Sequence, residues 1–118
     1  MLRLSDNFRY FFCHESVSLK YRHNGLGCYV KNELHRDPLN GDVYIFMSKN
    51  QKTLRAFYYY NKKLILTEAK LLEGKFPRPV FDVHAKAYEI SRVNFVRMVE
   101  GIIPTKGTFD ACSISVYY

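Results

Sequence analysis

The stretch NELHRDPLNGDVYIFMSKN, residues 32–50, contains the switch from helix to strand that organises the chain. Pro38 predicts the end of a preceding helix, because the residue before a proline is driven out of the helical region. Asn40-Gly41 tolerates the positive φ of a tight turn. Residues 42–47 are rich in β-branched and aromatic side chains, which favour a strand. The stretch therefore predicts a helix-to-strand corner.

The segment before this corner has the spacing of an amphipathic helix. Its apolar side chains recur at i, i+3, i+4 and i+8, and they are Leu26, Tyr29, Val30 and Leu34. Asn24 is the predicted N-cap. Further upstream, residues 8–12 predict a short strand, and residues 15–19 either continue that strand or pair with it.

The segment after the corner predicts an antiparallel meander. Residues 53–60 and 64–72 form its second and third strands, with a polar turn before the first of them and a tight turn at 61–63 between them. Connections this short are incompatible with parallel crossovers. Residues 73–82 hold two prolines and a glycine and should be irregular.

The remainder of the chain predicts an edge strand, a second helix and a final strand. The strands are expected at residues 84–90 and 108–118, and the helix at 91–101. Ser91 is its predicted N-cap and Gly101 its stop. The predicted apolar stripe of this helix is Phe95, Val96 and Val99, with Met98 flanking it. The fold class is therefore α+β, a single domain over residues 1–118 with a curved antiparallel sheet and two main helices on one face.

Composition and charge narrow the class of protein. The chain of 118 residues is 47% hydrophobic and 16% aromatic, which suits one domain with a hydrophobic core. Its net charge of +7 favours contact with polyanions. An odd set of three distant cysteines, Cys13, Cys28 and Cys112, argues against a disulfide framework. With neither a signal peptide nor a membrane-spanning run apparent, we expect a cytoplasmic protein that does not contact membranes.

Candidate chemistry is sparse in this sequence. The four histidines are scattered without metal-ligand spacing, so neither a metal nor a cofactor is expected. Glu33, Asp37 and Asp42 cluster around the corner and could in principle hold the metals of a nuclease. Helix surface, turn initiation and strand cap explain these carboxylates equally well. We therefore predict a protein that is not an enzyme and has no catalytic residues.

Basic and aromatic residues interleave in the meander. The predicted DNA-binding residues are Lys49, Lys52, Arg55, Lys62 and Lys63, which lie in or beside its two turns. Basic hairpin tips beside aromatic strands can hold a nucleic-acid backbone. The alternative is that the aromatics fill the core while the lysines only solvate the loops.

Three segments resemble one known family. They are residues 24–50, residues 70–76 (KLLEGKF) and residues 90–102 (ISRVNFVRMVEGI). Together they resemble the TnpB accessory protein of IS-sixty-six type insertion sequences, over about residues 8–103, and leave residues 104–118 as a divergent tail. The resemblance implies a small protein encoded beside a transposase and assisting transposition. Asn32, Glu33 and Asp37, which packing explains least, are the predicted protein-contact residues.

The sequence departs from that family pattern in three places. Leu19-Lys20 replaces a Met-Arg pair, YYYNKK lacks a Trp and a Gly, and the tail 104–118 is not rich in Arg and Lys. We predict a non-catalytic accessory protein for DNA transposition whose partners are the transposase of the same element and, as an open possibility, double-stranded DNA. The alternatives are an adaptor that contacts only proteins and, less favoured, a metal-dependent nuclease.

Overall fold

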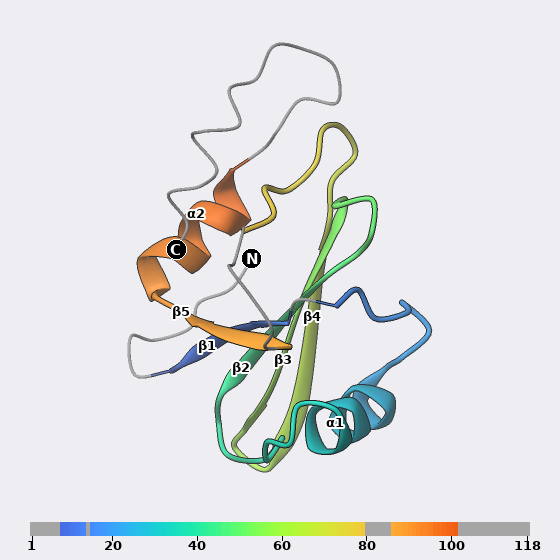
Figure 1. Ribbon diagram of the computed structural model, residues 1–118, viewed down its shortest axis with the longest axis vertical. Helices are drawn as coiled ribbons and strands as arrows, with labels where there is room; N and C mark the ends of the chain where they lie inside the picture. Colours follow the sequence, from blue (N-terminus) through green and yellow to red (C-terminus); the bar gives the residue numbers. More distant parts are fainter. Residues whose placement is uncertain (1–7, 14, 80–85, 102–118) are drawn as a thin grey trace.

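The computed structural model describes residues 8–13, 15–79 and 86–101. The elements in chain order are β1 (Tyr10–Cys13), α1 (His23–Asn32), β2 (Val43–Met47), β3 (Thr53–Tyr60), β4 (Lys63–Lys70), β5 (Ala87–Ile90) and α2 (Arg92–Glu100). The strands form one five-stranded sheet in the order β4-β3-β2-β1-β5 (Figure 1). One sheet and two helices confirm the predicted α+β class.

The sheet is mixed, so the prediction of a wholly antiparallel sheet is wrong. The meander of β2, β3 and β4 is antiparallel as predicted. The pairing of β1 with β2 is parallel, with Tyr10 opposite Val43 and Phe12 opposite Ile45. The connection between these strands contains α1 and is long enough for a parallel crossover. β5 then pairs antiparallel to the outer side of β1.

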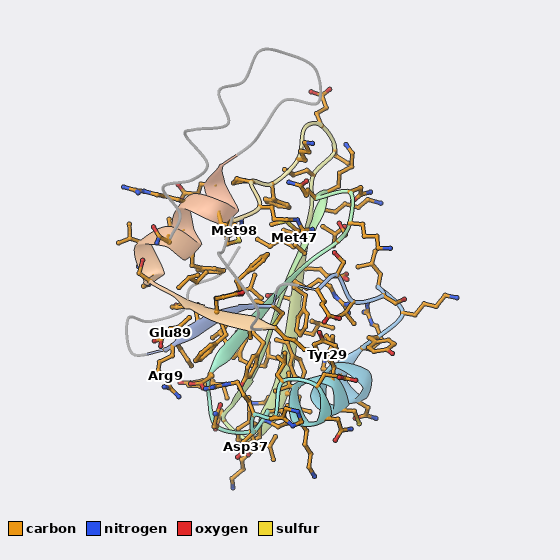
Figure 2. The ribbon with its side chains drawn as sticks, in the orientation of Figure 1. Arg9, Tyr29, Asp37, Met47, Glu89 and Met98 are labelled. Atoms are coloured by element: carbon orange, nitrogen blue, oxygen red, sulfur yellow. The ribbon has the colours of Figure 1, made fainter. Side chains whose placement is uncertain are left out.

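The two helices cover opposite faces of the sheet, and the prediction that they share one face is also wrong (Figure 1). Leu26 and Val30 of α1 pack with Phe57 in one core cluster. Phe95 and Met98 of α2 belong to the other cluster. In Figure 2, Met98 of α2 and Met47 of β2 lie close together in the layer between α2 and the sheet.

The inner strands explain why both faces need a cover. Successive side chains of a strand point to opposite faces. Tyr10 and Phe12 accordingly lie in the α2 cluster, while Phe11 and Cys13 lie in the α1 cluster. All of β1 and β2 is buried. Such continuous apolar runs are typical of strands covered on both sides, and this signal was present in the sequence.

The first helix has other ends than those predicted. It begins at His23 with Arg22 at the N-cap position, so the prediction of Asn24 as N-cap is wrong. It ends at Asn32. Three residues later, at His35, the backbone turns with a φ of 55°. The Arg36 amide then donates to the Val30 carbonyl at 3.1 Å. The chain therefore leaves the helix before Pro38 exerts its effect, and the assignment of the stop to Pro38 is wrong.

The second helix matches its prediction more closely. The Ser91 side chain accepts a hydrogen bond from the Asn94 amide at 3.1 Å, which confirms it as the N-cap, and Gly101 is the C-cap residue. Phe95 and Met98 are its buried residues. Met98 is therefore a core residue rather than a flanking one. Phe95 stacks on Tyr10 with ring centroids 4.7 Å apart, which anchors α2 to β1.

Two further strand predictions have different outcomes. Residues 15–19 are not a strand; they belong to an irregular connection, residues 15–21, which we call the strap. The predicted strand at 84–90 is present as β5 over its described part. The predicted final strand at 108–118 lies outside the described residues.

Candidate functional site

The helix-to-strand corner is organised around one buried carboxylate, that of Asp42, which is 5% exposed. Arg9 donates two hydrogen bonds to it: Nε lies 3.1 Å from Oδ1, and a terminal nitrogen lies 2.9 Å from Oδ2. Arg36 donates to Oδ2 at 2.8 Å and the Asn40 amide donates to the same oxygen at 3.0 Å. Charge-assisted bonds of this kind are among the stronger hydrogen bonds of proteins. The Asp42 carboxylate is therefore fully occupied by side chains of its own chain.

Further contacts hold the same arginines in place. The Arg36 guanidinium lies over the Phe11 ring at 4.0 Å and also donates to the Tyr44 hydroxyl at 3.3 Å. Gly41 turns the chain with a φ of 89°, a conformation that side chains disfavour. Burial raises the pKa of the Tyr44 hydroxyl, although Arg36 beside it acts in the opposite direction. The most diagnostic stretch of the sequence is thus a folding element.

The three carboxylates proposed for a nuclease have separate partners. Asp42 is paired with arginines, and Glu33 with the Lys86 ammonium at 3.1 Å. Asp37 accepts the Leu39 amide at 2.9 Å, which is a local turn bond. Within residues 8–13, 15–79 and 86–101, no group of three or more His, Cys, Asp or Glu side chains is placed to hold a metal ion. This geometry offers no support for the nuclease alternative.

The structure divides the predicted DNA-binding residues between two ends of the sheet (Figure 1). Lys49 and Lys52 lie in the β2–β3 turn, while Lys62 and Lys63 lie at the β3–β4 turn. The eight residues of β3 separate these turns, which is a distance of about 27 Å at ~3.4 Å per residue. Lys49, Lys62 and Lys63 are exposed. The five residues therefore do not form one surface.

Arg55 lies inside the protein, at 1% exposed. It donates to the backbone carbonyls of Ser18 and Tyr21 in the strap. Its Nε lies 3.2 Å from Glu68 Oε1. This contact is an ion pair, because its geometry is not that of a hydrogen bond. Burial lowers the pKa of Arg55, while the charge of Glu68 raises it. Arg55 therefore fastens the strap to the sheet, and its side chain is not presented to a phosphate.

The strap forms one wall of a groove at the β2–β3 end of the sheet, which we call the cationic groove. Its volume is about 560 Å³ and its lining residues are Ser16, Val17, Ser18, Leu19, Ser48, Lys49, Asn50, Thr53 and Lys70. Lys49 and Lys70 are exposed. Between them lie hydroxyl and amide groups, which suit the oxygens of a phosphate backbone. Among the residues that the structure describes, no acidic side chain lines this groove.

More cations stand around the cationic groove. The Arg78 guanidinium donates to the Ser48 carbonyl at 2.9 Å and lies 3.4 Å from the Ser16 hydroxyl, so it joins the two walls. The Lys52 ammonium donates to the Gly74 carbonyl at 3.2 Å and closes the loop after β4. Lys75 follows in that same loop. This end of the sheet therefore combines cations that bind backbone carbonyls, Lys52 and Arg78, with the exposed side chains of Lys49 and Lys70.

A second groove, which we call the acidic groove, lies between the strap and α1. Its volume is about 540 Å³, and its lining includes Asn32, Glu33, Glu15 and Lys86. The Lys86 ammonium stands 3.1 Å from Glu33 and 3.9 Å from Glu15, and the hydrogen bond to Glu33 raises the pKa of Lys86. Tyr29 presents a buried hydroxyl without a hydrogen-bond partner among the described residues. Of the predicted protein-contact residues, Asn32 and Glu33 meet here and Asp37 does not.

Sequence reasoning missed the residues that build these features. Arg9 and Asp42 are 33 positions apart, and the contact between Arg78 and Ser16 spans 62 positions. Spacing arguments do not reach pairs so distant in sequence. Lys70 was assigned only to a strand, although its place at the end of β4 brings it into the cationic groove.

The chain belongs to the family of IS66 Orf2-like proteins, whose model matches residues 8–108. This confirms the resemblance seen in the sequence. Among curated proteins, the chain is similar to the uncharacterized protein y4jC of Sinorhizobium fredii (strain NBRC 101917 / NGR234). The two are 30% identical over 102 residues, which cover 86% of each chain. No solved structure matches the chain.

None of the helices within the described part of the chain is both long enough and apolar enough to cross a membrane.

Proposed function

We propose that the protein is an accessory factor of IS66-type transposition that contacts the DNA of its element through the cationic groove. Membership in the IS66 Orf2-like family supports the transposition role. The observation that carries DNA contact is the groove itself, in which exposed Lys49 and Lys70 accompany hydroxyl and amide groups, with no acidic side chain among the described lining residues.

The electrostatics favour backbone contact over base reading. Lysine heads on flexible stems neutralise phosphates but carry no sequence information. Each neutralised phosphate releases condensed counterions, so the logarithm of the association constant should fall linearly with the logarithm of salt concentration. With about three phosphates contacted, the expected slope is roughly −3.

Binding of the purified protein to a labelled duplex tests this proposal. One duplex carries the terminal repeat of the element and the other a scrambled sequence, and both are titrated from low to physiological salt. We expect similar affinity for both duplexes and a steep decline with salt. No binding at low salt would contradict the proposal. A preference for the terminal repeat would show that base contacts act in addition.

The acidic groove supports a second proposed contact, with the transposase. Two carboxylates, those of Glu15 and Glu33, share one ammonium there, and the side chains of both are about half exposed (53% and 52%). A lysine or arginine of a partner would meet acceptors in that groove. Capture of the transposase should be weakened by Asn32→Arg, whose added cation opposes such a partner. His35→Arg adds an equally exposed cation outside the acidic groove and is the matched control.

A protein without catalytic activity remains our prediction for this family member. The separate partners of Glu33, Asp37 and Asp42 support it. Incubation of a supercoiled plasmid with the protein and Mg²⁺ or Mn²⁺ tests it directly. Cleavage that disappears in Asp37→Asn would contradict the prediction and restore the nuclease alternative.

A further inference from the structure

We propose that the outer edge of β4 pairs with β4 of a second copy of this chain, in an antiparallel register that places Ala69 opposite Ala69. β4 is the terminal strand of the sheet among the described residues, and its outer side has no partner there. It pairs continuously with β3 over eight residues, without a bulge or a proline. A long regular edge of this kind is a template for another strand.

The backbone groups available at this edge follow from the ladder. The Leu71 amide donates to the Lys52 carbonyl, so the odd-numbered residues of this strand point toward β3. Because backbone groups alternate along a strand, those of Leu66, Glu68 and Lys70 point outward. Two copies related by a two-fold axis at Ala69 would pair each outward Glu68 backbone with the outward Lys70 backbone of the other copy.

Charge selects this register from its neighbours. Within its own chain the Glu68 carboxylate lies 3.2 Å from Arg55 and 3.6 Å from Arg22, and its side chain is 38% exposed. With Ala69 on the axis, this carboxylate also faces Lys70 of the other copy, giving two further opposite-charge pairs. A shift that places Glu68 on the axis opposes two carboxylates, and a shift that places Lys70 there opposes two ammonium groups. Registers centred on Leu66 or Thr67 place Glu68 opposite a leucine. The side chains of Glu68 and Lys70 are therefore self-complementary in one arrangement.

Two further observations agree with an axis at Ala69. Leu72 is 92% exposed, and this register sets it beside Leu66 of the second copy. Helix α1 packs against the opposite end of β4, where Leu64 and Leu66 join its core cluster. An axis near Ile65 would bring the two α1 helices together, whereas an axis at Ala69 separates them along the strand. The pairing also brings the two cationic grooves toward each other, because Lys70 lines each one. In the dimer Lys70 is paired with Glu68 of the second copy, so the exposed Lys49 is the groove lysine that is left for phosphate.

Disulfide trapping tests the register without DNA, so its outcome is separate from that of the proposed function. In a Cys28→Ser, Cys112→Ser background, Ala69→Cys places two thiols across a pair whose Cα atoms are ~4.5 Å apart, within disulfide reach. We expect a covalent dimer under mild oxidation on a non-reducing gel. Ile65→Cys, on the same face of the same strand, should remain monomeric. Crosslinking through Ile65 but not Ala69 would overturn the proposed register.

Light scattering on the full chain tests self-association itself. We expect the mass of a dimer for the wild type. Lys70→Glu converts both attractive pairs into repulsive ones and should raise the dimer dissociation constant about tenfold. Lys63→Glu makes the same charge change on the same strand outside the pairing, and should leave the mass unchanged. A monomeric wild type at high concentration would overturn the proposal.

Discussion

The helix-to-strand corner and the cationic groove both contain arginine or lysine, yet they use that charge in opposite ways. At the corner, Arg9 and Arg36 converge on the buried carboxylate of Asp42. At the groove, Lys49 and Lys70 are exposed, and none of the lining residues in the described part of the chain is acidic. An arginine or lysine is therefore most available to a polyanion where no carboxylate of the same chain is paired with it.

The largest expected effect is the loss of stability when the Asp42 carboxylate is removed from the helix-to-strand corner. Asp42→Asn leaves two arginines without their counter-charge and should lower the free energy of unfolding by about 3 kcal/mol. Asp37→Asn is the matched control, because an exposed asparagine can accept the same turn bond. Urea denaturation measures both variants. Equal stability of the two would contradict the structural role of Asp42.

The next largest effect is a loss of stability in the strap, residues 15–21, which borders both grooves. Arg55→Lys keeps the charge but loses the fork that binds the Ser18 and Tyr21 carbonyls, and should cost about 1–2 kcal/mol. Amide hydrogen exchange should then accelerate in the strap, residues 15–21. Arg22→Lys alters an exposed ion pair to Glu68 instead, and should leave the exchange pattern unchanged.

A smaller effect is the pH dependence of stability that Tyr29, in the lining of the acidic groove, should cause. Burial, with the charges of Glu15, Cys13 and Glu33, raises the pKa of Tyr29 to about 12 from its ordinary value of 10.0. As pH rises, the Tyr29 hydroxyl of the unfolded chain loses its proton at a lower pH than that of the folded chain. The free energy of unfolding should therefore fall as pH rises from about 10 to 12. Tyr29→Phe should reduce that decline. An identical pH dependence in wild type and variant would refute the assignment.

The smallest predicted effect is a gain at the β3–β4 turn. Asn61 and Lys62 have φ values of 52° and 64°, a region that glycine occupies without strain. Relief of the left-handed strain, roughly 1–2 kcal/mol, exceeds the extra conformational entropy that glycine loses on folding, so Lys62→Gly should stabilise the protein by about 0.5 kcal/mol. Asn61→Gly should gain less, because asparagine already tolerates this conformation. A loss of stability in Lys62→Gly would mean that the lysine side chain makes a contact that offsets its strain.

Local chemistry was the predictable part of this fold. The sequence predicted β3 at its observed bounds, the Ser91 cap and the Asn40-Gly41 turn, because each depends on neighbouring residues. Helix placement was not predicted, since an apolar stripe shows that a helix has a buried side but not which face of the sheet it meets. The continuous apolar character of β1 and β2 could have indicated two covered faces.

The candidate site was less predictable than the fold. Arg55 reads as a basic residue beside a turn, and only the position of the strap shows that its guanidinium is buried. Lys49 and Lys62 read alike in the sequence, as turn lysines next to strands. Their separation by the length of β3 depends on the meander as a whole. Lys70 and the strap enter the groove through contacts that residue spacing does not encode.

The central claim is that the cationic groove, and not the opposite turn, contacts DNA. A matched pair of charge reversals tests it: Lys49→Glu in the β2–β3 turn and Lys62→Glu in the β3–β4 turn, both at exposed positions. The account predicts that Lys49→Glu lowers duplex affinity about tenfold and reduces the salt slope by roughly 1, while Lys62→Glu changes neither. Equal losses in the two variants, or a loss in Lys62→Glu alone, would contradict it.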